Sequence, residues 1–236
     1  MSSKSSAELL KLDWCSFNAA KFACLNWHYS KAVPSGKMVK IGVWERGSFR
    51  GVILFGRGAN NHMLMPFGLA VTEGAELVRV ALREHETPVT RMISVALCML
   101  KRNSPGLKAV VSFADPEQGH IGGIYQGGGW LYTGKSVPMP EYMVHGTRVH
   151  GRTASALKSQ HPAAKSMNRL TFLRRHVDPN ATELMGSSKH RYLWVYDRKL
   201  LKKLQALPYP KDSACAVVDG ARVPPEQGVR PDPHAQ

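Results

Sequence analysis

ELVRVALREHETPVTRMISVALCMLKRNSPGLKAVVSFADPEQGHIGGIYQGGGWLY, residues 76–132, decides the fold of this chain. It opens with the apolar run 76–82, whose β-branched residues are typical of a strand. Thr87 as the N-cap and Pro88 at the first helical position then start a helix over about residues 88–102, where apolar residues recur every three or four positions. The run 109–115 has the composition of an interior strand, and a short strand follows the glycine-rich segment. This strand–helix–strand–helix–strand order predicts an α/β core.

The segments on either side of this core extend the expected sheet. Residues 37–45 and 49–56 are strand-like and flank an Arg-Gly turn, so they predict a hairpin. Residues 58–74 form a long loop rich in Gly, Asn and Met, and loops of this length often border a site. A strand over 189–196 and a short basic helix over 198–207 complete a mixed, mostly antiparallel sheet flanked by helices.

Three regions are expected along the 236 residues. They are a flexible arm over 1–12, one folded domain over 13–207 and a disordered proline-rich tail over 208–236. The chain has no apolar stretch of the roughly 20 residues that a membrane span needs, and its start lacks an apolar signal core. Four scattered cysteines without CxxC spacing indicate reduced thiols in a cytoplasmic protein. We therefore expect no membrane partner.

The charge of the chain predicts a polyanionic partner. Its net charge is +15 and its pI about 9.9, and neutralising phosphates releases counterions from nucleic acid. Much of the excess follows residue 145, as a basic C-terminal extension of the domain. A basic but otherwise ordinary surface is the alternative. The candidate DNA-binding residues are Arg148, Arg152, Arg174, Arg175, Lys189 and Arg191.

Tyr125, Ser112 and Asp115 are the candidate catalytic residues of the core. A phenol at Tyr125 has an intrinsic pKa of about 10, close enough to that of a thiol to protonate a leaving thiolate. Asp115 follows a strand at its carboxyl end, where α/β folds often place a crevice, although an Asp before Pro116 also caps helices. The dense glycines around Tyr125 fit either close backbone approach to a ligand or plain turns.

His28 and Tyr29 are a second cluster of functional groups. A histidine beside a tyrosine can act as a base, stack on a nucleobase or ligate a metal. The alternative is a structural hinge between a helix and a strand. With Asp115, these two side chains form a possible mixed N/O metal site if the fold brings them together. Arg79 lies three residues after Glu76 on one strand, so these two side chains point to opposite faces.

Three stretches, 37–59, 76–97 and 110–134, resemble the Mom DNA-modification proteins of bacteriophages. The resemblance covers about residues 26–210, and SFADPEQGHIGGIYQGGGWLYTG is long and specific. It implies a fold related to the GNAT N-acetyltransferases, in which an acyl carrier lies between two splayed strands. It also implies modification of adenine in phage DNA at the exocyclic amine, as a carbamoylmethyl adduct that protects the genome from host restriction. The expected location is the host cytoplasm.

The resemblance also implies cofactors. Acetyl-CoA is the cofactor of the acetyltransferase pattern, and iron or another divalent metal is the second candidate. That pattern binds phosphate at an Arg/Gln-x-x-Gly-x-Gly/Ala turn, whereas this chain has REHETPVTR, so a phosphate site must be built differently. The candidate cofactor-binding residues are Arg79, Thr87, Thr90 and Arg91. Tyr125 matches the tyrosine that protonates CoA in that superfamily, with IYQGGGW in place of LYxxxGF.

The residues alone are also compatible with two other classes of protein. One is an ordinary acetyl-CoA-dependent N-acetyltransferase that acts on a small amine or a protein. The other is a basic DNA-binding protein without catalytic activity. Loss of activity on changing Tyr125 or Asp115 distinguishes an enzyme from the second class.

Overall fold

The computed structural model describes residues 9–34, 36–57 and 62–211. The arm expected over 1–12 and the tail expected over 208–236 therefore lie mostly outside the described residues. Within them, no helix is long and apolar enough to cross a membrane.

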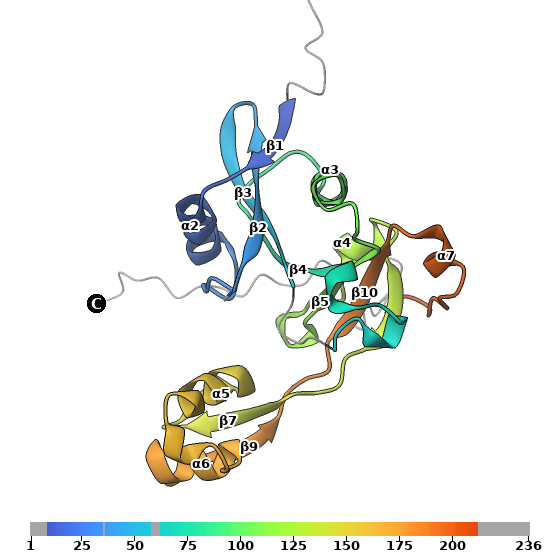
Figure 1. The fold of residues 1–236 in the computed structure, drawn as a ribbon. Coiled ribbons are helices and arrows are strands. Elements are labelled where there is room, and N and C mark those ends of the chain that lie inside the picture. Colours follow the sequence, from blue (N-terminus) through green and yellow to red (C-terminus); the bar gives the residue numbers. More distant parts are fainter. Residues whose placement is uncertain (1–8, 35, 58–61, 212–236) are drawn as a thin grey trace, which may run out of the picture.

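A seven-stranded sheet forms the centre of the described chain (Figure 1). Its strands are β1 (Leu10–Trp14), β2 (Met38–Glu45), β3 (Ser48–Gly56), β4 (Gly74–Leu82), β5 (Ala109–Ala114), β10 (His190–Val195) and β6 (Leu131–Lys135), in that spatial order. Neighbours pair antiparallel except β4 and β5, which pair parallel. The expected mixed, mostly antiparallel sheet is confirmed. Its first strand, β1, begins inside the segment expected to be a flexible arm.

The β2–β3 hairpin forms as the Arg-Gly turn predicts. Arg46 has φ 50° and Gly47 has φ 78°, so both turn residues are left-handed. This geometry matches the right-handed twist of the two strands.

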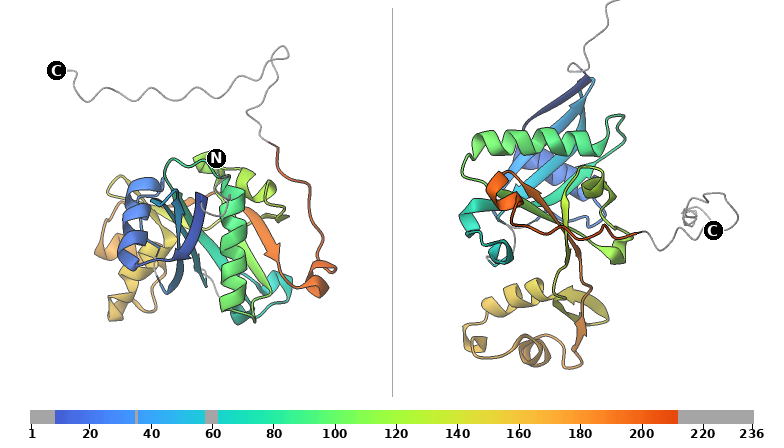
Figure 2. Two further views of the ribbon diagram at one scale, coloured as in Figure 1. Left: turned by 90° about the horizontal axis from the view of Figure 1, so that it is seen from above. Right: turned by 90° about the vertical axis from the view of Figure 1, so that its right-hand side faces the viewer.

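Helices cover both faces of the sheet (Figure 2). On one face, α2 (Phe17–Trp27) begins after the capping residue Ser16 and buries Ala20, Ala23 and Cys24 against β3 and β4. On the other face, α3 (Val89–Asn103) buries the stripe that its sequence predicts. The short helices are α4 (Gly123–Gln126), α7 (Arg198–Leu201) and the 3-10 turns η1 (Met65–Phe67), η2 (Val71–Glu73), η3 (Pro116–Gln118) and η4 (Pro162–Ala164).

The parallel strands β4 and β5 separate soon after they meet. Only Gly74, Ala75 and Glu76 of β4 pair with β5, and the last pair is Glu76 with Val111. Beyond it, β4 continues beside β3 while β5 continues beside β10. The sheet is therefore open between Leu77 and Ser112, and α4 carries Tyr125 to this opening.

A second, smaller sheet is inserted between β6 and β10 (Figures 1 and 2). It contains β7 (Pro140–Val144), β8 (Thr147–His150) and β9 (Thr182–Met185), covered by α5 (Gly151–Ser159) and α6 (Arg169–His176). Tyr142, Val144, Ala154, Phe172 and Leu173 belong to its separate core. Most of the basic segment thus lies in an insertion, and the chain afterwards returns to the main sheet.

Candidate active site

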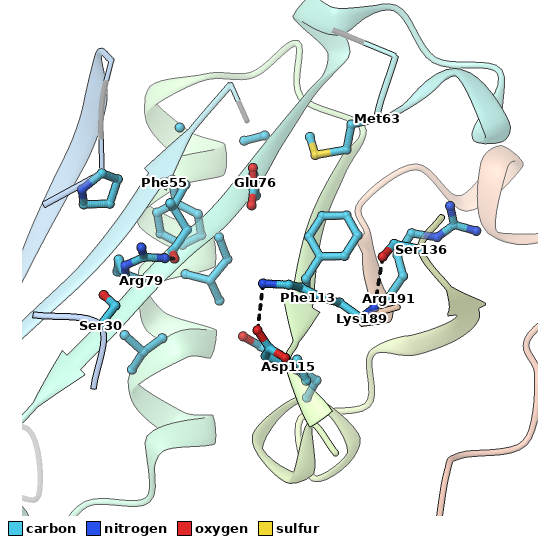
Figure 3. A pocket seen from close by; sticks show the side chains of 18 of the residues that line it. Ser30, Phe55, Met63, Glu76, Arg79, Phe113, Asp115, Ser136, Lys189 and Arg191 are labelled. Carbon is cyan, nitrogen blue, oxygen red and sulfur yellow. Dashed lines mark hydrogen bonds and ion pairs between the residues drawn. The ribbon is translucent and has the colours of Figure 1, made fainter. Parts of the chain in front are cut away.

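A cleft of about 2360 Å³ begins where β4 and β5 separate (Figure 3). Its lining extends to residues of the small sheet. It brings together the predicted residues His28, Tyr29, Arg79, Asp115, Tyr125, Arg152, Lys189 and Arg191. Thr87, Thr90, Arg91, Arg148, Arg174 and Arg175 do not line it, and Ser112 lies buried directly behind Tyr125.

Tyr125 and Ser112 form the buried end of the cleft. The Ser112 hydroxyl oxygen lies 2.9 Å from the carbonyl oxygen of Leu77 and 2.7 Å from the phenol oxygen of Tyr125. A carbonyl only accepts, so the single Ser112 proton goes to Leu77 and the Tyr125 phenol donates to Ser112. Burial raises the pKa of Tyr125 to about 12. The phenol therefore keeps its proton at neutral pH.

His28 is neutral and has one ring nitrogen engaged. Its Nδ1 accepts the backbone N–H of Ser30 at 3.1 Å, and a neutral ring then carries its proton on Nε2. Burial and then the positive charge of Arg79 lower the pKa of His28 to about 4. The side chain is only 8% exposed. His28 is thus a fixed hydrogen-bond donor rather than an available base.

Tyr29 stands in a row of three rings at the cleft. Its ring centroid lies 4.2 Å from that of His28 and 5.4 Å from that of His120. Unlike His28, Tyr29 is 52% exposed. An exposed aromatic ring in a cleft offers a stacking surface to a planar ligand.

Asp115 is an ionised acceptor held from several directions. Lys189 Nζ lies 2.8 Å from its carboxylate, and the backbone N–H of Glu117 donates to it at 3.1 Å. Burial alone would raise the pKa of Asp115, but the contact with Lys189 outweighs it, and the pKa lies below its ordinary value. Asp115 therefore both caps η3, as one alternative predicts, and faces the cleft. Figure 3 shows it with Lys189 on the β5 side of the pocket.

Arg79 supplies positive charge on the β4 side of the same pocket (Figure 3). Its Nη1 donates to the carbonyl of Val78 at 2.9 Å. Its Nε is buried without a hydrogen-bond partner in the described structure. Arg79 is the one predicted cofactor-binding residue that lines the cleft.

The turn before α3 does not fit the phosphates of acetyl-CoA. Pro88 occupies the capping position and no side chain caps the helix, so the prediction of Thr87 as the N-cap is wrong. The carboxylate of Glu45 instead accepts the backbone N–H groups of Thr87 at 2.6 Å and Glu86 at 3.0 Å. Glu45 is 4% exposed. Two amides of this turn thus already hold an internal anion, and Pro88 has no N–H to offer a phosphate.

The described residues also lack a ready metal site. They contain no group of three or more His, Cys, Asp or Glu side chains placed to hold a metal ion. Of the three predicted ligands, Asp115 is paired with Lys189 and His28 uses Nδ1 internally. This arrangement does not fit a metal held by His28, Tyr29 and Asp115.

The predicted DNA-binding residues fall into three groups. Arg148 is ion-paired with Glu117 at 3.0 Å and with Glu141, while Arg191 donates twice to Thr133 at 2.9 Å. Arg152 and Lys189 line the cleft. Arg174 and Arg175 lie exposed on α6, outside the cleft lining, so their contact with DNA stays a prediction.

Sequence reasoning missed Glu45 and His120 as site residues, and it included Arg169 only as one residue of the basic segment. Glu45 ends a strand and binds amides about forty positions away, which no local pattern shows. His120 lies in the glycine-rich segment, where the neighbouring glycines indicate a turn and give no sign of a role for the histidine. Arg169 follows Asn168, whose side chain caps α6 by accepting the N–H of Thr171 at 2.7 Å. An asparagine before a helical stretch indicates the start of a helix, and this was the signal that could have located Arg169.

The fold and the cleft define a mixed α/β protein with a basic binding cleft that ends in ionisable and aromatic side chains. The model of the Mom protein family matches residues 9–211, and the chain belongs to this family of phage DNA-modification proteins. A comparison with curated proteins found no match. Membership implies a DNA-modifying enzyme.

Proposed function

We propose that this protein modifies adenine in phage DNA at the exocyclic amine, giving a carbamoylmethyl adduct that protects the genome from host restriction. The observation that carries the proposal is the exposed ring of Tyr29, which stands in a basic cleft between His28 and His120. The family supplies the DNA substrate, and the cleft supplies a surface for a base.

The target adenine must leave the base stack to reach this cleft, because its exocyclic amine is paired within a duplex. Enzymes that act on a base pay a few kcal/mol to extrude it and recover the cost by stacking. Stacking on an aromatic side chain contributes about 1–3 kcal/mol per base. Tyr29 is placed for this role, and its phenol need not take part in the reaction.

The polar groups beside Tyr29 have distinct proton states. Asp115 is ionised through its contact with Lys189 and accepts a hydrogen bond from the adenine amine at a carboxylate oxygen. Tyr125 keeps its proton, because burial raises its pKa to about 12; this proton goes to Ser112, so the phenol oxygen accepts a hydrogen bond and orients the bound molecule. Arg79 supplies positive charge for a donor molecule that carries negative charge. Ser112 holds Tyr125 in position.

The experiment is mass spectrometry of nucleosides from plasmid DNA of cells that express the protein. The expected product is deoxyadenosine heavier by one carbamoylmethyl group. Tyr125→Phe should abolish it, whereas Tyr196→Phe is the matched control, because that phenol bonds the carbonyl of Leu97 away from the cleft. Unmodified DNA from cells with folded protein would contradict the proposal.

Two changes at Tyr29 separate stacking from chemistry. Tyr29→Phe keeps the ring and should retain modification, while Tyr29→Ala removes the ring and should lose it. Loss in both variants would show that the phenol oxygen itself is needed, as a base or a metal ligand requires.

A further inference from the structure

The end of the cleft that faces the small sheet carries two arginines with free guanidinium groups. Arg152 lies in the first turn of α5, and Arg169 is the first residue of α6. Both line the cleft. Neither side chain has a hydrogen bond or an ion pair within the described parts of the chain. A Cβ atom added at Gly151 would lie 3.4 Å from Arg169 Nη1, so the Arg169 guanidinium sits against the start of α5.

The acidic residues at this end are already neutralised by other cations. Lys189 holds Asp115 at 2.8 Å. Arg148 holds both Glu117, at 3.0 Å, and Glu141. Among the described residues, Arg152 and Arg169 are consequently two cationic side chains of the cleft with neither a counterion nor a hydrogen-bond partner.

His150 lies next to Arg152. It is the last residue of β8 and caps α5, where its Nδ1 accepts the backbone N–H of Arg152 at 3.1 Å. Burial and then the charge of Arg152 lower the pKa of His150, and Lys189 and Arg169 act in the same direction. Glu141 acts in the opposite direction, and the net shift leaves His150 neutral beside these cations.

An arginine in the first turn lowers the stability of α5 and of α6. The N-terminus of a helix carries partial positive charge, so a cation in the first turn is unfavourable there. Neither α5 nor α6 has an acidic residue in its first turn. A bound anion would reverse the penalty, because it would meet both guanidinium groups.

We propose that Arg152 and Arg169 bind a backbone phosphate of the DNA next to the target nucleotide. The inference rests on the proposed function and deepens it, because it assigns the phosphate that follows the extruded base. One cleft joins these arginines to Tyr29 and Tyr125, so a single DNA strand lying along it can place a base in the pocket and a phosphate at the arginines. Guanidinium groups suit this ligand, since they bind phosphate oxygens in pairs.

The experiment measures DNA binding by fluorescence anisotropy over a range of salt concentrations. The variants are Arg152→Ala, Arg169→Gln and the pair, and Arg169→Gln keeps a side chain against Gly151. The slope of log affinity against log salt is negative. Each lost phosphate contact should make it less steep by about one unit, equally on all sequences. Arg152→Lys keeps the charge and should keep the slope.

Lys165→Ala is the matched control, because Lys165 is an exposed cation of the small sheet region that does not line the cleft. It should bind DNA as the unchanged protein does. A double variant that is folded and keeps the original salt slope would overturn this phosphate site. If the unchanged protein shows no affinity for DNA at any salt concentration, the proposed function itself fails instead.

The product assay gives a second readout. The arginine variants should modify DNA at a normal rate when DNA is saturating and slowly when it is scarce, so KM rises and kcat is kept. A fall in kcat with unchanged KM would overturn the assignment, because it would place the two arginines in the chemical step.

Discussion

The hydroxyl of Ser112 lies 2.7 Å from the phenol oxygen of Tyr125 at the point where β4 and β5 separate. The same hydroxyl reaches the Leu77 carbonyl of β4 at 2.9 Å. One small side chain thus links the two separated strands to the helix that carries Tyr125. The ring of Tyr125 also packs against the rings of Trp130 and Tyr192, with centroid distances of 5.2 and 5.1 Å. The hydrogen bond and these two rings together fix the phenol.

Tyr125→Phe should abolish DNA modification while leaving the protein folded. The change removes one hydrogen bond, whose net contribution is about 1 kcal/mol, and keeps the packed ring. Ser112 still donates to Leu77. Thermal unfolding and nucleoside mass spectrometry on the same preparation check both parts. A folded variant with full activity would remove Tyr125 from the reaction.

His28 should make the protein less stable as the pH falls from about 6.5 towards 4. Its folded pKa is lowered to about 4, whereas an unfolded histidine titrates near 6.5. In this window the unfolded chain binds the proton and the folded chain does not, so stability falls with pH. The free energy of unfolding should fall by at most a few kcal/mol, because each pKa unit of difference between the two states contributes about 1.36 kcal/mol.

Denaturant unfolding at several pH values measures this dependence. His28→Asn should flatten the curve between these two pH values. An unchanged slope in the variant would assign the dependence to another group.

Glu45→Gln should lower the stability at neutral pH by about 1–3 kcal/mol, because hydrogen bonds to a charged acceptor are lost. Burial alone would raise the pKa of Glu45, but bonds from Thr87 and Glu86 outweigh it and hold the pKa below its ordinary value. This stabilisation is present above the unfolded pKa of about 4.3 and is lost as pH falls through the folded one. The two proteins should therefore converge in stability in acid.

Acetyl-CoA should leave the melting temperature of the protein unchanged, even at millimolar concentration. Glu45 already accepts the backbone N–H groups of Glu86 and Thr87 in the turn before α3, and a ligand stabilises only a state that it binds. Differential scanning fluorimetry with acetyl-CoA, and with duplex DNA as the positive control, tests this. A concentration-dependent rise with acetyl-CoA would show that the carrier binds elsewhere in the cleft.

Arg148→Ala should weaken DNA binding although Arg148 does not line the cleft. Its removal leaves Glu117 and Glu141 without their partner, and both carboxylates line the cleft. Adding Glu117→Gln should restore part of the affinity, because one of the uncompensated charges is then removed. If the double variant binds as weakly as Arg148→Ala, Arg148 contacts phosphate directly.

The local patterns of the sequence predict much of the main sheet. The hairpin of β2 and β3, the stripe of α3 and the strands β4, β5 and β10 form where periodicity and turn residues place them. The helix expected over residues 198–207 ends at Leu201. The small sheet escaped prediction, because its strands are short and β9 pairs with β7 only across the inserted helices.

By itself the sequence determined the strand and helix order, the excess of positive charge and the position of Tyr125, since these depend on neighbouring residues and composition. Only the tertiary structure decided which cations are paired with carboxylates of the protein and which face the cleft. The partners lie far apart in the chain: Arg148 and Glu117 are 31 positions apart, and Glu45 lies 42 positions from Thr87, whose backbone N–H it accepts. Long-range electrostatic pairing depends on distance in space, which no local pattern of residues encodes.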